Sequence, residues 1–372
     1  MKASSNQKAF FALVRAGLWE QDVRLASFGE IDFSEIYRIA EEQSVIGLVA
    51  VGLEHVRDTI VPKEDLLQFV GQALLIEQQN QAMNGFIEKL FEDMRQAGIY
   101  ALLVKGQGVA QCYEIPLWRS SGDVDFFLDA INYEKAKRFI IPLASSPGHE
   151  NRDNKHFEVT IDPWVVELHG TLWWGVPTKI DREINKIQRD TFENGRIRYW
   201  KNGDADIPLP EANNDVIFIF THFLKHFFRG GIGLRQICDW CRLLWTFRDA
   251  IDMRLLEERL KAMGLRTEWK AFAAFAVDYL GAPGDMMPLY SNDACWKKKA
   301  RRIKDFVLEV GNFGHNRDLS YYSKYSFFVR KSISFGRRCS DFARHARIFP
   351  LDSIRFFISI IFNGIRFVIR GE

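Results

Sequence analysis

An Asp-x-Asp pair inside an apolar stretch is the clearest chemical feature of the sequence. Asp123 and Asp125 lie in the segment Ser-Ser-Gly-Asp-Val-Asp-Phe-Phe-Leu. In a β-strand, residues two apart point to the same side, so the two carboxylates would be held close together. Such a pair repels itself unless a divalent cation or another positive group lies between its members. A lone Asp-x-Asp also occurs by chance in surface loops, which is the alternative interpretation of this segment.

A third carboxylate, Glu167, lies in a second apolar stretch, Val-Val-Glu-Leu-His. A buried charge needs a partner, so we expect Glu167 to join the two aspartates in a metal site. His169 would share its face of the strand. It belongs either to the site or to the ordinary buried histidines that are satisfied by one hydrogen bond.

The segment Lys105-Gly106-Gln107-Gly108 follows the apolar run Leu-Leu-Val. A strand, a glycine turn and a helix start would expose backbone N–H groups that suit a phosphate. Lys105 would add a positive charge, although lysines at strand ends are often simply solvated.

Three further charged residues are candidates for contacts with a ligand. Arg119 lies four residues before Asp123 and could contact a phosphate, the acidic residues, or a structural partner. Arg235 and Asp239 are four apart in a helical pattern, so they would form an intrahelical ion pair or point at a nucleotide.

His222, His226, Cys238 and Cys241 are residue types that bind zinc. We favour a different interpretation for the two cysteines. They occupy apolar positions of a helical pattern and suit small buried side chains.

The pattern of helices and strands that the sequence indicates around these residues predicts an α+β protein. Helical periodicity dominates residues 1–97 and returns in residues 209–372, while residues 98–208 form a mixed α/β core. The strands that we expect in the core are Ile99–Val104, Val124–Leu128, Phe157–Ile161, Trp164–Leu168 and Arg196–Trp200. Asp162-Pro163 predicts a hairpin turn, and Asn213, Asn214 or Asp215 would cap the next helix.

Composition narrows the class of protein. The chain has 372 residues, 47% of them hydrophobic, and a net charge of +2. These values favour a globular protein with a large core over a dedicated nucleic-acid binder. No apolar run approaches the ~20 residues of a membrane span, and the first residues do not resemble a signal peptide. Five scattered cysteines indicate reduced thiols, mostly buried. We therefore expect a cytoplasmic protein.

The C-terminal segment, residues 330–372, is basic and amphipathic. It could bind an anionic membrane surface, a nucleic acid or a protein partner. We favour a helix that packs its apolar face on the body of the protein, through Phe356, Phe357, Ile360, Ile361 and Ile365.

In combination and order, these motifs resemble the uncharacterised nucleotidyltransferase family of the DNA polymerase β superfamily. The segments that carry the resemblance are LLVKGQGVAQCY, PLWRSSGDVDFFL, VVELHG and THFLKHFFRGGIGLRQICDWCRLL, and the match covers roughly residues 10 to 290. The sequence departs from the wider superfamily in having Gly106-Gln107 at the turn, a longer gap to the acidic pair, and Glu167 where an aspartate is commoner.

The resemblance implies a small mixed sheet with flanking helices that binds Mg²⁺, or Mn²⁺, and a nucleoside triphosphate, with ATP favoured. Asp123, Asp125 and Glu167 would be the catalytic and metal-binding residues, with Glu167 completing the metal site or acting as a base. The nucleotide would contact a larger set of residues: Lys105, Gly106, Gln107, Arg119, Ser121, Gly122, His169, Arg235 and Asp239.

The expected reaction is transfer of a nucleoside monophosphate, AMP in the favoured case, to a hydroxyl acceptor on a small molecule or protein, with release of pyrophosphate. Two alternatives remain at this point. The chain could be a non-catalytic nucleotide sensor, or an antitoxin-like module that acts through protein contacts.

Overall fold

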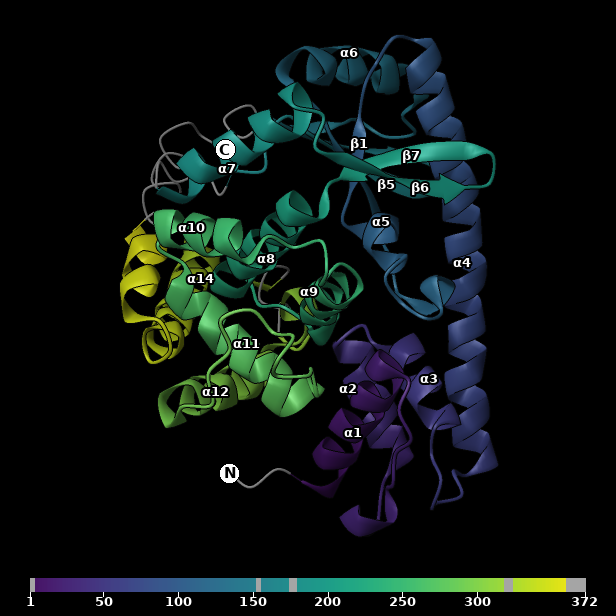
Figure 1. Ribbon diagram of the computed structural model, residues 1–372, viewed down its shortest axis with the longest axis vertical. Coiled ribbons are helices and arrows are strands. Elements are labelled where there is room, and N and C mark those ends of the chain that lie inside the picture. The colour runs from purple at the N-terminus through teal and green to yellow at the C-terminus, as the bar shows by residue number, and fades with distance from the viewer. Residues whose placement is uncertain (1–3, 152–154, 174–178, 318–323, 359–372) are drawn as a thin grey trace.

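The structure, a computed structural model, describes residues 4–151, 155–173, 179–317 and 324–358. It confirms the α+β prediction: in chain order, a mixed sheet follows a helical N-terminal region and precedes a helical C-terminal region. In Figure 1 the strands lie above the helices of the N-terminal region and beside those of the C-terminal region.

Four helices form the N-terminal region, as the apolar periodicity predicts. They are α1 (Ser5–Trp19), α2 (Phe33–Glu42), α3 (Ile46–Glu54) and α4 (Lys63–Gln96). The long α4 runs past the other three helices and continues beside the strands (Figure 1). It therefore connects the N-terminal helices to the sheet.

The main sheet has the strand order β1-β2-β5-β4-β3. Its strands are β1 (Leu102–Val104), β2 (Asp123–Phe127), β3 (His149–Asn151), β4 (His156–Ile161) and β5 (Trp164–His169). β2 and β5 are parallel, whereas the other neighbouring pairs are antiparallel. The sequence had predicted four of these five strands and the hairpin turn between β4 and β5, but not β3.

Each face of the sheet packs on a different core. One face, which includes Val124, Phe126, Val166 and Leu168, packs with the end of α4 and with α6 (Ala130–Ile140). On the other face, Phe127 contacts Phe218 of α8 (Ala212–Arg229), with ring centroids 5.5 Å apart. Since side chains alternate along a strand, Asp123 and Asp125 lie on the same face as Phe127, toward α8.

Two further elements of the core region were not predicted. α7 (Lys179–Glu193) follows β5, and β7 (Ala205–Pro210) pairs with the predicted strand, now β6 (Ile197–Asn202), in a second, two-stranded sheet. β7 also lies against the main sheet, where Leu209 packs with Leu103 in one core.

The C-terminal region is helical, as predicted. Besides α8 it contains α9 (Leu234–Thr246), α10 (Met253–Met263), α11 (Arg266–Leu280), α12 (Ala294–Val310) and α14 (Phe327–Ala346).

The cap predicted for α8 was wrong. The N-cap residue is Glu211, and all three candidates lie inside the helix. Their side chains serve other partners: the Asn213 amide donates to Glu211 and to the carbonyl of Ala250, and Asp215 accepts a hydrogen bond from Arg198 at 2.7 Å.

Phe356 supports a C-terminal segment that packs on the protein body. Its side chain is buried, and its ring stacks on Phe228 of α8 with the centroids 4.3 Å apart. Phe357 contacts Phe342 of α14. The other predicted contact residues, Ile360, Ile361 and Ile365, lie outside the described residues.

Candidate functional site

Three carboxylates from two strands meet on the face of the sheet that points to α8. Asp125 on β2 is directly paired with Glu167 on β5 in the parallel ladder, and Asp123 lies two residues earlier on the same face. One carboxylate oxygen from each of the three lies within 4.8 Å of the others. The structure thus brings together the three residues that the sequence predicted as metal ligands.

The electrostatics of Asp123 reflect this crowding. The charge of Asp125, followed by burial, raises the pKa of the Asp123 carboxyl to about 6, while Lys105 opposes the shift. A carboxyl with a raised pKa holds a charge that the fold leaves only partly compensated. A divalent cation would supply the missing positive charge.

Lys105 is held against the carboxylates by an unusual backbone. Its φ is +58°, and the next residue, Gly106, has a φ of +38°. This turn directs the Lys105 ammonium to Asp125, with Nζ 2.6 Å from Oδ1. Burial alone would lower the pKa of Lys105, but Asp125, Glu167 and Asp123 raise it above its usual value. Lys105 is therefore a part-buried, ion-paired cation of the site and not a solvated lysine at a strand end.

Two histidines contact Glu167. The Nε2 atom of His156, on β4, lies 3.1 Å from Glu167 Oε2, and His169 Nε2 lies 3.2 Å from the same oxygen. His169 Nε2 is also 2.6 Å from Asp125 Oδ1. Burial would raise the pKa of Glu167, but the hydrogen bonds from both histidines and the charge of Lys105 hold it well below its usual value.

Arg119 and Asp239 form a buried ion pair next to the carboxylates. The Arg119 guanidinium donates to both oxygens of Asp239, at 2.7 Å each, and also to Ser121 Oγ at 2.7 Å. Tyr113 donates a further hydrogen bond to Asp239 at 2.8 Å. Burial lowers and the Asp239 charge raises the pKa of Arg119, with a net rise. The pair joins α9 to the loop that leads into β2.

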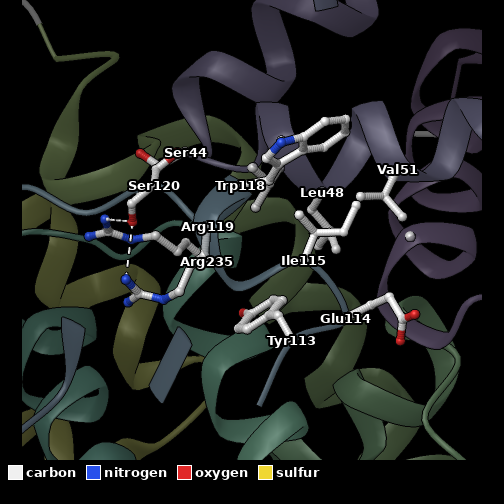
Figure 2. Close-up of a pocket in the computed structure, with 13 residues that line it drawn as sticks. Ser44, Leu48, Val51, Tyr113, Glu114, Ile115, Trp118, Arg119, Ser120 and Arg235 are labelled. Atoms are coloured by element: carbon white, nitrogen blue, oxygen red, sulfur yellow. Dashed lines mark hydrogen bonds between the residues drawn. The ribbon is translucent and has the colours of Figure 1, made fainter. Parts of the chain in front are cut away.

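Arg235 has a different partner from the one that its spacing suggested. Its Nη1 donates to the carbonyl of Ser120 at 2.6 Å, while Asp239 is taken by Arg119. Burial lowers the pKa of Arg235. Arg119 donates to the same carbonyl at 3.2 Å (Figure 2), so both arginines order the loop before Gly122 and Asp123.

Gln107 points away from the carboxylates. Its amide donates to Asn80 of α4 at 2.7 Å, and the Asn80 amide donates in turn to the carbonyls of Leu117 and Arg119. The side chain of Gln107 thus fixes the loop to α4. Only its backbone remains for contact with a ligand.

A pocket opens beside this loop, between α1, α3 and α9. It has a volume of about 390 Å³, including open solvent at its mouth. Apolar side chains such as Leu48, Ile115 and Trp118 form one end, and Ser44, Ser120 and Arg235 form the other (Figure 2). The lining of the pocket thus combines an apolar end with a polar end.

One helix face that the sequence analysis did not assign to the site faces the carboxylates. His222, Lys225 and His226 follow Phe218 along α8, and the Lys225 ammonium donates to the carbonyl of Trp173, beyond the end of β5, at 3.1 Å. Burial and neighbouring cations lower the pKa of Lys225 to about 7 and that of His226 to about 3. The missed signal was the spacing of three polar residues at i, i+3 and i+4 in the largely apolar stretch of α8 from Val216 to Phe228.

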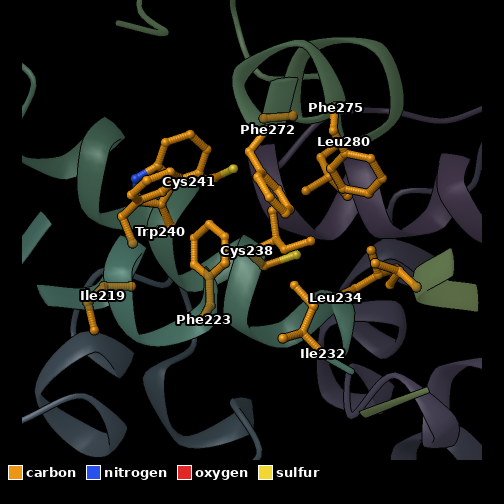
Figure 3. Close-up of a cluster of buried hydrophobic side chains, with 14 of the residues drawn as sticks. Ile219, Phe223, Ile232, Leu234, Cys238, Trp240, Cys241, Phe272, Phe275 and Leu280 are labelled. Carbon is orange, nitrogen blue, oxygen red and sulfur yellow. The ribbon is translucent and has the colours of Figure 1, made fainter. Parts of the chain in front are cut away.

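The cysteines of α9 belong to the core. Cys238 and Cys241 are fully buried among Phe223, Trp240 and Phe272 (Figure 3). Burial strongly raises the pKa of both thiols, which opposes the thiolate form that binds zinc. All five cysteines are free, and three of them are buried. The prediction of small buried residues is confirmed.

Among the described residues, no helix combines the length and the apolar character needed to cross a bilayer.

Comparison with known proteins identifies the family. The family model of an uncharacterised nucleotidyltransferase matches residues 29–281, which is more than half of the chain. No curated protein and no solved structure matches the chain significantly. The matched region contains the three carboxylates, Lys105, both site histidines and the Arg119–Asp239 pair. The chain belongs to this family of uncharacterised nucleotidyltransferases.

Proposed function

We propose that the protein is a Mg²⁺-dependent nucleotidyltransferase that moves the nucleoside monophosphate of a nucleoside triphosphate to a hydroxyl acceptor. The observation that carries the proposal is the carboxylate cluster of Asp123, Asp125 and Glu167 in a member of a nucleotidyltransferase family. ATP is the nucleotide that we propose, and pyrophosphate is the second product.

The three carboxylates fit a hard divalent cation. Oxygen donors are the ligands of Mg²⁺ and Mn²⁺, and the raised pKa of Asp123 indicates uncompensated negative charge. When bound, such a cation would neutralise charge on the phosphate oxygens of the nucleotide.

Positive and polar groups surround the carboxylates where the triphosphate would lie. Lys105 and the turn at Gly106 stand on one side, and Lys225 and His222 of α8 on another. The other residues that we propose near the nucleotide are the backbone of Gln107, the loop residues Ser121 and Gly122, and His169. We assign Arg119, Arg235 and Asp239 an indirect role, since their hydrogen bonds order the loop.

Glu167 is better suited to hold a metal than to act as a base. Its pKa is held well below the usual value by two histidines, so its affinity for a proton is low. A general base works best with a pKa near the operating pH. We therefore propose Glu167 as a ligand.

The pocket beside the loop is the acceptor site that we propose. Ser120 lines it and precedes Asp123 by three residues, a span of at most about 11 Å. The mixed lining favours a small hydroxylated molecule with an apolar part over a protein side chain.

In the proposed reaction the acceptor oxygen attacks the α-phosphorus of the nucleotide. A new O–P bond forms, the bond between the α-phosphorus and its bridging oxygen breaks, and pyrophosphate leaves with the bonding electrons. The hydroxyl proton passes to solvent. The protein residues orient the reactants and balance their charge, which is where most catalysis of such transfers arises.

The test follows label from α-labelled ATP, GTP, CTP and UTP into acceptors of a metabolite extract, with Mg²⁺ present. We expect the wild type to label an acceptor and release pyrophosphate, and Asp123→Asn and Asp125→Asn to abolish both. Glu134→Gln is the matched control, because Glu134 is an exposed acid of α6, the helix that packs on the opposite face of the sheet. Tight Mg²⁺-dependent nucleotide binding without transfer to any acceptor, small molecule or protein, would overturn the proposal in favour of a nucleotide sensor.

A further inference from the structure

A second group of donor atoms adjoins the carboxylate cluster and contains nitrogen. His156 of β4 is directly paired with His169 of β5 in the antiparallel ladder, so both rings lie on the face that carries Glu167. The ring centroids are 4.9 Å apart. A ligand atom from each of the three residues lies within 4.8 Å of the others.

The distances between these atoms match a metal coordination shell. In a tetrahedral zinc site with bonds of 2.0–2.1 Å, neighbouring ligand atoms are about 3.3 Å apart. Glu167 Oε2 lies 3.1 Å from His156 Nε2 and 3.2 Å from His169 Nε2.

Hydrogen bonding alone satisfies this arrangement poorly. Both Nε2 atoms converge on one oxygen of Glu167, and His169 Nε2 also faces Asp125 Oδ1 at 2.6 Å. A single N–H of His169 cannot point well at two carboxylates at once. One cation among the three residues would satisfy the converging atoms together.

Charge and donor type indicate which cation this would be. Asp123, Asp125 and Glu167 face the single ammonium of Lys105 within the cluster, so negative charge remains in excess. Imidazole nitrogen favours borderline metals such as Zn²⁺, whereas Mg²⁺ prefers oxygen. Glu167 has two oxygens, so it can serve both donor groups.

We propose that His156, Glu167 and His169 form a binding site for a borderline divalent cation of the Zn²⁺ type, adjacent to the oxygen-only site and sharing Glu167 with it. Three protein ligands leave the fourth position open to water, the arrangement of reactive zinc sites. This inference does not depend on nucleotidyl transfer, since it concerns metal binding alone.

The experiment uses tag-free, full-length protein that has been stripped of metal with a chelator. Co²⁺ is titrated in excess Mg²⁺, which keeps the oxygen-only site filled, and visible absorption reports nitrogen ligation and low coordination number. We expect one Co²⁺ per chain, displaced by one Zn²⁺.

Two variants and a control assign the ligands. His156→Ala should weaken Zn²⁺ binding by at least about 10- to 100-fold, the loss that follows removal of even an outer partner of a ligand. His149→Ala should bind like the wild type, because His149 is an exposed histidine of the same sheet. Asp123→Asn should keep the Co²⁺ spectrum but lose Mg²⁺-dependent nucleotide binding, which separates this inference from the proposed function.

Equal Zn²⁺ affinity in His156→Ala and His149→Ala would overturn the proposal. So would the pale spectrum of six-oxygen Co²⁺ in the wild type, or the absence of binding. The spectrum of the wild type decides the question even where His156→Ala fails to fold. In each of these negative cases the two histidines would serve only as hydrogen-bond partners of the carboxylates.

Discussion

Removing one member of the buried ion pair between Arg119 and Asp239 should lower the stability of the protein. Only 6% and 7% of the two side chains is exposed, and two hydrogen bonds of 2.7 Å join them. Arg119→Met would leave the Asp239 carboxylate buried with Tyr113 as its remaining donor. Breaking one side of a buried ion pair destabilises a protein by about 3–5 kcal/mol. We expect a loss in this range.

The corresponding change in Tm follows from the size of the chain. An unfolding entropy of about 2.1 cal/mol/K per residue over 372 residues gives about 0.8 kcal/mol/K. A loss of about 4 kcal/mol should therefore lower the Tm by about 5 °C. Arg254→Met is the matched control: it removes an exposed ion pair with Glu258, and its effect should stay below about 1 kcal/mol.

A double-mutant cycle isolates the pair. Urea unfolding of Arg119→Met, Asp239→Asn and the double variant would be followed by tryptophan fluorescence and by circular dichroism, whose transitions must coincide for a two-state treatment. We expect the double variant to lose about 2–3 kcal/mol less than the sum of the single variants, because each single change strands the other residue.

Nucleotide binding to folded Arg119→Met tests the alternative that Arg119 binds a phosphate of the nucleotide. Arg119 touches Ser121 and the Ser120 carbonyl, so Arg119→Met should weaken nucleotide binding only modestly, through the loop. Unchanged stability together with abolished nucleotide binding would refute this reasoning, since it would place the guanidinium on a phosphate instead of on Asp239.

Three further outcomes follow from the structure. The Asp123 pKa of about 6 means that Mg²⁺ must displace a proton at lower pH. Calorimetry should therefore show Mg²⁺ affinity falling about fivefold from pH ~6 to pH ~5, and a flat profile would contradict the raised pKa. The Lys225 pKa of about 7 leaves the amine largely neutral at pH ~8, so binding of a triphosphate should take up a proton. Calorimetric heats of binding should then differ between buffers, and Lys225→Met should abolish this difference. In urea unfolding, Phe356→Ala should destabilise the protein by about 3–5 kcal/mol because its ring is buried against Phe228. Ile358→Ala, which changes a half-exposed side chain, should destabilise it by less than about 1 kcal/mol. Equal effects of the two substitutions would argue against a docked C-terminal segment.

Much of the sheet could be predicted because the side chains of neighbouring residues alternate between the two faces of a strand, so a short stretch of sequence reveals the pattern. Val124 and Phe126 flank Asp125 on the opposite face, so the strand and the face of its acid are encoded within a few residues. The parallel pairing of β2 with β5, which brings Glu167 opposite Asp125, depends on contacts 42 residues apart. The sequence predicted that these residues meet but did not contain a local signal for the register.

Other features were missed for identifiable reasons. α7 is a polar helix, yet Ile180, Ile184 and Ile187 recur at helical spacing and could have revealed it. The partnership of Arg119 with Asp239 spans 120 residues and has no local signature. The i+4 spacing of Arg235 and Asp239 favoured an ion pair between them, but Asp239 pairs with Arg119. A bidentate guanidinium from another element satisfies a buried carboxylate better than an intrahelical pair does.

The packing of the sheet bears on how the chain divides into units. The boundaries at residues 97 and 208 stay predictions, but the larger apolar core contains side chains from all three regions, among them Phe10, Phe127 and Phe223. The face with the carboxylates is covered by α8, and the loop before β2 is fixed by α4 and α9. A fragment of residues 98–208 would therefore expose Phe127 and lose Asp239, the ion-pair partner of Arg119. Since the helical regions supply the walls of the site as well as its supports, we expect the metal site to require the N-terminal and C-terminal helices and not the central α/β core alone.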